Sequence, residues 1–162
     1  MKYLLLTLFV FSLLACNQQT GNTEILQNRI DSLETKIANS YKPGFGDFMS
    51  AIQAHHYKLW FAGQNENWDL ADFEMHEIME IIEDIQTVHA GRKETEVIGM
   101  IDPAIDSINF AIKKKDPTLF KSRYNSLTIA CNKCHRETDH GFIVVKIPDA
   151  SPFGNQDFSA RE

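Results

Sequence analysis

The sequence predicts an all-α fold, an antiparallel four-helix bundle with an additional N-terminal helix and an extended C-terminal tail. Apolar residues recur every three or four positions through most of the range 47–134, which is the period of amphipathic helices. Glycine and proline interrupt this pattern at intervals, and amphipathic helices joined by short loops bury their apolar stripes most simply in a bundle. The composition, 43% hydrophobic and 23% charged over 162 residues, is that of a globular protein.

The N-terminal segment has the features of an export signal. Lys2 precedes an apolar run over 3–14, and a small residue stands just before Cys16. The apolar run is shorter than the roughly 20 residues that a membrane-spanning helix needs. Its end, LLAC at 13–16, resembles the lipobox of bacterial lipoproteins.

This resemblance implies a particular processing and location. Segment 1–15 is then a signal peptide that is removed, and Cys16 is lipidated, since several acyl chains on one residue anchor a protein stably. Because Asn17 rather than Asp follows, the resemblance also implies transfer to the outer membrane of the cell envelope, with the protein facing the periplasm. The alternative is an ordinary signal peptide in which Cys16 has no special role.

Segment 16–46 is predicted to be a lipid-anchored tether followed by an amphipathic or coiled-coil helix. The stretch 17–23 is polar, and a helix is expected over 24–40. Its apolar residues have heptad spacing: Leu26, Ile30, Leu33 and Ile37. About two heptads are few for a coiled coil, so the helix either folds back or serves as a stalk, or it mediates self-association. Strong helix breakers at 41–46 end the segment.

The bundle domain is expected over 47–140, with helices at about 47–62, 68–89 and 94–115 and a fourth that begins after residue 116. Asp47 and Asp116 are predicted as N-caps, and Gly63 is predicted to end the first helix. Pro103 lies inside the third region, where it either kinks the helix or starts a new one with Asp102 as its cap.

The chemistry-bearing residues form the sequence CNKCH at 131–135. Two thiols three residues apart lie on one face of a helix, so they can bond to the two vinyl groups on one edge of a porphyrin. The adjacent histidine then reaches the iron. A C-x-x-C-H sequence is the attachment site of c-type haem. It predicts one covalent haem c, with thioether bonds from Cys131 and Cys134 and with His135 as the proximal axial ligand.

Other interpretations of this sequence are a zinc site with His140 as a further ligand, a thioredoxin-like redox pair, or a plain disulfide. Haem is favoured because the cysteines other than Cys16 all belong to the motif. It is also favoured because the expected export signal leads to the compartment in which bacteria attach haem c.

A four-helix bundle with C-x-x-C-H near the end of its last helix resembles the cytochrome c′ family and its low-spin relatives. The resemblance covers about 47–140, and it implies the same thioether and axial-ligand roles for the motif residues. The chain departs from the family in its lipid anchor, its extra N-terminal helix and its tail at 141–162. The apolar stretch 142–147 of this tail is expected to be extended and to lie across the bundle or the haem edge.

The identity of the sixth iron ligand determines whether electron transfer or gas binding at an open iron is the expected function. In an up-down bundle the start of the first helix lies beside the end of the fourth, so Met49 is expected at the height of His135. Low-spin members of the family use a methionine of the first helix, and Met49 is the matching residue. His56 shares that helix face but lies about 10 Å further along the axis, and it is the alternative sixth ligand. The third possibility is an iron with no second protein ligand.

These observations together predict a membrane-anchored monohaem cytochrome c that transfers single electrons to redox partner proteins and is not an enzyme. The alternative is a protein that binds or senses nitric oxide or carbon monoxide at an open iron, as cytochrome c′ does. Peroxidase-like activity is less favoured, because it needs polar groups beside an open iron. The formal charge of −6 argues against a nucleic-acid partner.

Overall fold

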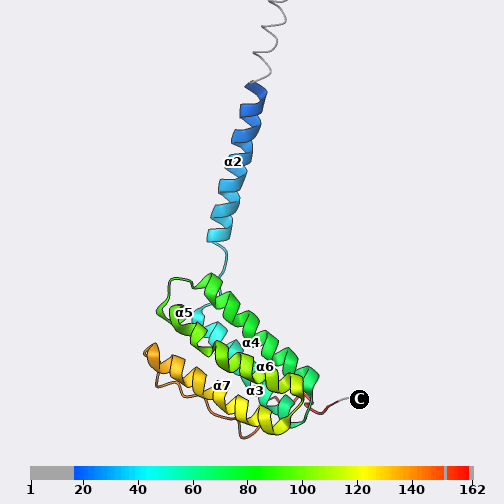
Figure 1. Ribbon diagram of the computed structural model, residues 1–162. Coiled ribbons are helices and arrows are strands. Elements are labelled where there is room, and N and C mark those ends of the chain that lie inside the picture. The colour runs from blue at the N-terminus through cyan, green and yellow to red at the C-terminus, as the bar shows by residue number, and fades with distance from the viewer. Residues whose placement is uncertain (1–16, 152, 161–162) are drawn as a thin grey trace, which may run out of the picture. The chain divides into compact units, whose positions relative to one another are not determined.

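The computed structural model describes residues 17–151 and 153–160 (Figure 1). The predicted signal peptide, 1–15, and the predicted lipidation site, Cys16, lie outside these residues. The chain separates into two units between Lys42 and Pro43, inside the segment where the sequence contains strong helix breakers. Within the described part, every helix is too short or too polar to cross a membrane.

The described part of the first unit contains one long helix, α2 (Asn17–Ala38). The stretch 17–23, predicted as a polar tether, is therefore helical. Once a helix has nucleated, each further residue adds a backbone hydrogen bond, so polar residues such as glutamine and threonine extend it at small cost. The heptad residues of α2 remain 47–66% exposed: Leu26, Ile30, Leu33 and Ile37.

The second unit is helical as well, and its described residues include no strand. Its elements are α3 (Phe45–Gln64), α4 (Trp68–Val88), α5 (Lys93–Val97), the 3-10 helix η1 (Ile98–Ile101), α6 (Asp102–Lys114) and α7 (Pro117–Glu137). Helix α3 packs against α4, α4 against α6, α6 against α7, and α7 against α3. The long helices therefore enclose one shared core and lie side by side (Figure 1).

The ends of α3 differ from the prediction. Gly44 is the N-cap, whereas Asp47 lies in the first turn and its Oδ2 accepts a hydrogen bond of 2.8 Å from the Gly44 backbone N–H. Asp47 thus stabilises the helix start from inside the helix, as the acidic residue of a capping box does. The helix also continues past Gly63 to Gln64. Gly63 is needed there for packing, since a Cβ at this position would lie 2.2 Å from the Phe120 ring.

Proline marks the start of two helices in the second half of the unit. A new helix, α6, begins at Asp102, after the 3-10 turn η1, so Pro103 occupies a first-turn position and does not kink a longer helix. The residue that caps α6 is Ile101, not Asp102. The predicted cap of α7 is confirmed, because the Asp116 carboxylate accepts hydrogen bonds of 2.9 Å from the backbone N–H groups of Thr118 and Leu119.

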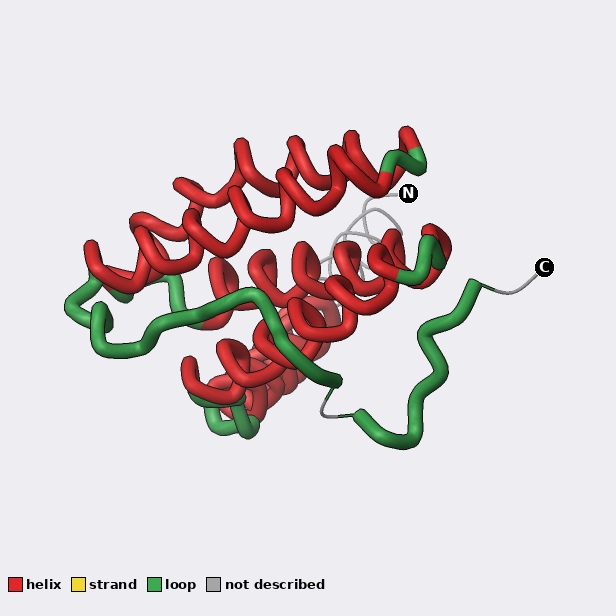
Figure 2. Tube along the Cα trace, turned by 90° about the horizontal axis from the view of Figure 1, so that it is seen from below, coloured by secondary structure: helices red, strands yellow, loops and turns green. Residues whose placement is uncertain are grey.

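After α7 the chain turns and runs back along the helices as a loop (Figures 1 and 2). Asn132 of α7 holds this loop, because its side chain donates to the Val145 carbonyl oxygen at 2.7 Å and accepts from the Val145 N–H at 2.8 Å. Further along, Phe158 is buried beside the Phe61 ring, and the Ser159 carbonyl accepts a hydrogen bond from Asn67. Hydrogen bonds and side-chain packing thus hold the tail against the helices at two places along the chain.

Candidate functional site

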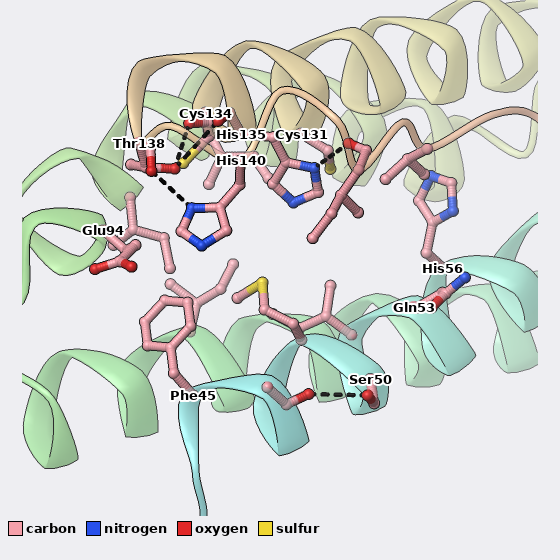
Figure 3. Close-up of a pocket in the computed structure, with 18 of the residues that line it drawn as sticks. Phe45, Ser50, Gln53, His56, Glu94, Cys131, Cys134, His135, Thr138 and His140 are labelled. Atoms are coloured by element: carbon pink, nitrogen blue, oxygen red, sulfur yellow. Dashed lines mark hydrogen bonds between the residues drawn. The ribbon is translucent and has the colours of Figure 1, made fainter.

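A cavity of about 590 Å³ lies beside α7 and brings the motif residues together. This volume is within the roughly 300–1,000 Å³ that small-molecule and cofactor sites usually have. Cys131, Cys134 and His135 line it from α7, and Figure 3 shows them across the pocket from Phe45 of α3, with His56 at one end of the pocket. Most of the remaining wall is apolar, with side chains from α3, α4, η1 and the tail: Ile52, Ile82, Ile98, Ile101, Ile143 and Val144.

Both motif cysteines are free and partly buried. Burial raises the pKa of the Cys131 thiol to about 12, with a smaller contribution from neighbouring Cys134. Burial also raises the pKa of Cys134. Both groups are therefore protonated thiols at neutral pH in the absence of a metal, whereas a reactive redox pair needs a thiolate. The two thiol groups nevertheless reach the same cavity, which is what attachment to one flat ligand requires.

His135 has one ring nitrogen fixed by the tail. Its Nδ1 lies 2.8 Å from the Ile143 carbonyl oxygen. A carbonyl oxygen can only accept, so Nδ1 carries a proton and donates it, and in the neutral ring Nε2 then has the free lone pair. A histidine that ligates a metal usually has its other nitrogen bonded to a carbonyl or carboxylate in this way, which fixes both the ring orientation and the tautomer.

The two candidate sixth ligands, Met49 and His56, both line the cavity from α3. His56 is 3% exposed, and its ring nitrogens contact the Tyr124 hydroxyl at 2.8 Å and Thr128 Oγ1 at 3.0 Å. The same hydroxyls also bond to the backbone, since Tyr124 donates to the His56 carbonyl oxygen at 2.8 Å and Thr128 donates to the Tyr124 carbonyl oxygen at 3.0 Å. Both nitrogens of His56 are engaged, whereas Met49 brings a partly buried thioether to the cavity.

Burial also affects the charge of His56. It lowers the pKa of the ring from 6.5 to about 4, so the side chain is neutral near pH 7. The neutral ring still has a partner for each nitrogen, because a hydroxyl group can donate to a ring nitrogen or accept from it. His56, Tyr124 and Thr128 therefore form a complete buried network at one end of the pocket.

The pocket also contains polar residues that the sequence motif did not predict. Arg92 and Glu94 line it, and the Glu94 carboxylate accepts two hydrogen bonds from the Arg92 guanidinium, at 2.7 and 3.1 Å. This pairing holds the pKa of Glu94 down at about 2. His140 also lines the pocket, with Nδ1 2.6 Å from the Thr138 carbonyl oxygen. Arg92 and Glu94 lie at the start of the short helix α5, where no periodic pattern marks them.

The cavity thus assembles all five residues predicted around the haem: Met49, His56, Cys131, Cys134 and His135. Among the described residues, no three histidine, cysteine, aspartate or glutamate side chains are grouped so that they could hold a metal ion. No family model, curated protein or solved structure matches this chain.

Proposed function

We propose that this chain is a monohaem c-type cytochrome that transfers single electrons between partner proteins. We also propose that α3, α4, α6 and α7 form an antiparallel four-helix bundle of the cytochrome c′ kind. The observation that carries the proposal is the convergence of both thiols and His135 on one largely apolar cavity. Cys131 and Cys134 would hold the porphyrin through thioether bonds, and His135 would ligate the iron.

The residues of the cavity fit this group in three respects. The two thiols are free and lie one helical turn apart, as attachment to two vinyl groups requires. The apolar walls match a porphyrin face and exclude water. His135 has its Nδ1 bonded to Ile143, which leaves Nε2 as the ligating atom. When bound, haem c supplies an iron that alternates between its ferrous and ferric states.

Met49 is the proposed sixth ligand. It belongs to α3 and lines the same cavity as His135 of α7. The structure supports it over His56, since the two nitrogens of His56 already have hydrogen-bond partners. A thioether opposite a histidine favours the ferrous state relative to two histidines. The protein would then have no open iron position and no ligand to exchange during electron transfer.

The first experiment tests attachment. Haem in the purified protein should survive acid–acetone extraction and add the mass of one haem to the chain. In the Cys131→Ala/Cys134→Ala variant the same extraction should remove all haem. Retention of haem by that variant, or a wild-type protein purified after haem-c maturation without bound haem, would contradict the proposal.

The second experiment tests Met49. Met49→Leu keeps the apolar volume, so we expect a folded protein with a high-spin spectrum and rapid carbon monoxide binding, unlike wild type. The matched control is Met75→Leu, a fully buried methionine of α4 that does not line the cavity, and it should behave as wild type. A wild-type protein that is already high-spin would instead support gas binding at an open iron.

We further propose that Cys16 is lipidated and anchors the protein in the outer membrane, facing the periplasm. The support is the LLAC sequence at 13–16, followed by Asn17. Fractionation of cells that carry Cys16→Ser tests the anchor, because membrane association unchanged from wild type would contradict it.

A further inference from the structure

Helix α2 presents an unusual apolar surface. Leu26, Ile30, Leu33 and Ile37 follow one another at spacings of four, three and four, and each is 47–66% exposed. These four side chains, called the α2 stripe below, lie on one face of a regular helix. A continuous row of exposed leucine and isoleucine is the usual mark of an interaction surface in a soluble protein.

The residue types in the α2 stripe indicate the kind of partner. In heptad terms the leucines occupy the d positions and the isoleucines the a positions. Isoleucine at a with leucine at d favours parallel two-stranded coiled coils over trimers and tetramers, because of how these side chains pack between two helices. The stripe therefore fits a second helix with the same pattern, and α2 of another copy has that pattern.

The charges beside the stripe indicate the same arrangement. Arg29 occupies a g position and Glu34 the e position of the next heptad. In a parallel pair the g residue of one helix lies beside the e residue of the next heptad on the other, so Arg29 would meet Glu34 of the second copy. Symmetry produces this pair twice. An antiparallel pair would instead bring Arg29 near Lys36 of the second copy, and both are positively charged.

We propose that α2 pairs with α2 of a second copy of this chain to form a parallel two-stranded coiled coil. The dimer goes beyond the proposed electron transfer and does not depend on haem. A stripe of about two heptads forms a short coiled coil, so dimerisation should depend on protein concentration. A parallel pair also places both N-termini at the same end, which suits two chains anchored in one membrane.

The experiment is analytical ultracentrifugation of the full mature chain in density-matched detergent, over a range of concentrations. Wild type should sediment as a dimer at the upper concentrations. Leu33→Asp places a charge in the stripe and should give a monomer throughout. Its matched control is Asn28→Asp, which adds the same charge at an exposed position outside the stripe and should remain a dimer.

Charge reversal tests the parallel register. Arg29→Glu and Glu34→Arg should each weaken dimerisation roughly five- to tenfold, since each replaces two attractive contacts by two repulsive ones. The double variant should recover wild-type dimerisation. A monomeric wild type, a trimer, a dimeric Leu33→Asp variant or a failed recovery in the double variant would each overturn the proposal. The haem spectrum should be the same in all variants, so the result is independent of the proposed function.

Discussion

The two ends of the helical unit are packed in different ways. At the end where α7 begins, aromatic rings fill the core: Trp60, Trp68, Phe120 and Tyr124 contact one another with ring centroids 4.8–6.4 Å apart. Phe120 and Tyr124 are fully buried. Gly63 of α3 lies so close to Phe120 that this position has no room for a side chain. This end is filled by the chain itself.

At the other end, the same two helices, α3 and α7, line a cavity of about 590 Å³. The side chains there are apolar enough for a core but do not meet across the space. Protein interiors normally leave few voids larger than a water molecule, so a cavity of this size is expected to hold a ligand. The comparison shows that the same helices pack tightly at one end of the unit and leave a cavity beside the motif at the other. The buried network of His56, Tyr124 and Thr128 connects the two ends, since Tyr124 belongs to the aromatic cluster and His56 lines the cavity.

The largest effect is expected from the filled end. Phe120→Ala should lower the free energy of unfolding by about 3–5 kcal/mol, because it removes a fully buried ring and leaves a cavity. Urea unfolding measures this change. Phe110→Ala on α6 is the matched control, since Phe110 is 55% exposed, and it should change stability by less than about 0.5 kcal/mol. Similar losses in both variants would contradict the assignment of the aromatic cluster as the core of this end.

The network between the two ends should make stability depend on pH. The pKa of His56 is about 4 when folded and 6.5 when unfolded. As the pH falls, His56 is therefore protonated in the unfolded chain before it is protonated in the folded chain. Its contribution to the free energy of unfolding is complete above pH 6.5 and is lost as the pH falls from 6.5 to 4. At about 1.36 kcal/mol for each pKa unit, the loss from this residue is about 3 kcal/mol.

Urea unfolding at several pH values measures this slope. His56→Gln has no titrating group at this position, so its stability should change less than that of wild type between pH 6.5 and pH 4. The remaining titratable groups contribute equally to both proteins, so the difference between the two pH slopes reports on His56. Equal slopes would mean that burial of His56 does not govern acid stability.

The smallest effect is expected at the wall of the cavity. Asn132→Ala removes both hydrogen bonds to the Val145 backbone and should lower the free energy of unfolding by about 1–2 kcal/mol, because each bond contributes modestly and alanine is the better helix former. Hydrogen exchange should show the change more clearly than unfolding does, because the Val145 amide should exchange faster than in wild type. Asn125→Ala is the matched control, as Asn125 is exposed on the same helix. Unchanged exchange at Val145 would show that Asn132 does not hold the tail.

The sequence predicted those features that depend on local patterns. Periodic apolar residues defined α4 and α7, the Asp-Pro signal marked the start of α7, and helix register placed Met49 on the side of the motif. Each of these follows from residues a few positions apart. The sequence could therefore predict that these residues line a common site, because a helix fixes the relative directions of its side chains.

Other features could not be predicted, since they depend on contacts between distant residues without a periodic pattern. The partners of His56 lie 68 and 72 positions away, on α7. The path of the tail is set by paired hydrogen bonds between Asn132 and Val145, and asparagine has many other possible partners. The role of Asp47 as an acceptor inside the first turn, rather than as the cap, depends on where Gly44 turns the chain.

The hydrogen bond from His135 to the Ile143 carbonyl also has a consequence for the order in which the site is completed. The ribosome makes the C-x-x-C-H motif before the segment that contains Ile143. All three motif residues can therefore be present in a helix while the imidazole ring still lacks its fixed orientation. A chain ending at His140 would contain both thiols and the histidine, yet the ring could rotate and present either nitrogen to the cavity.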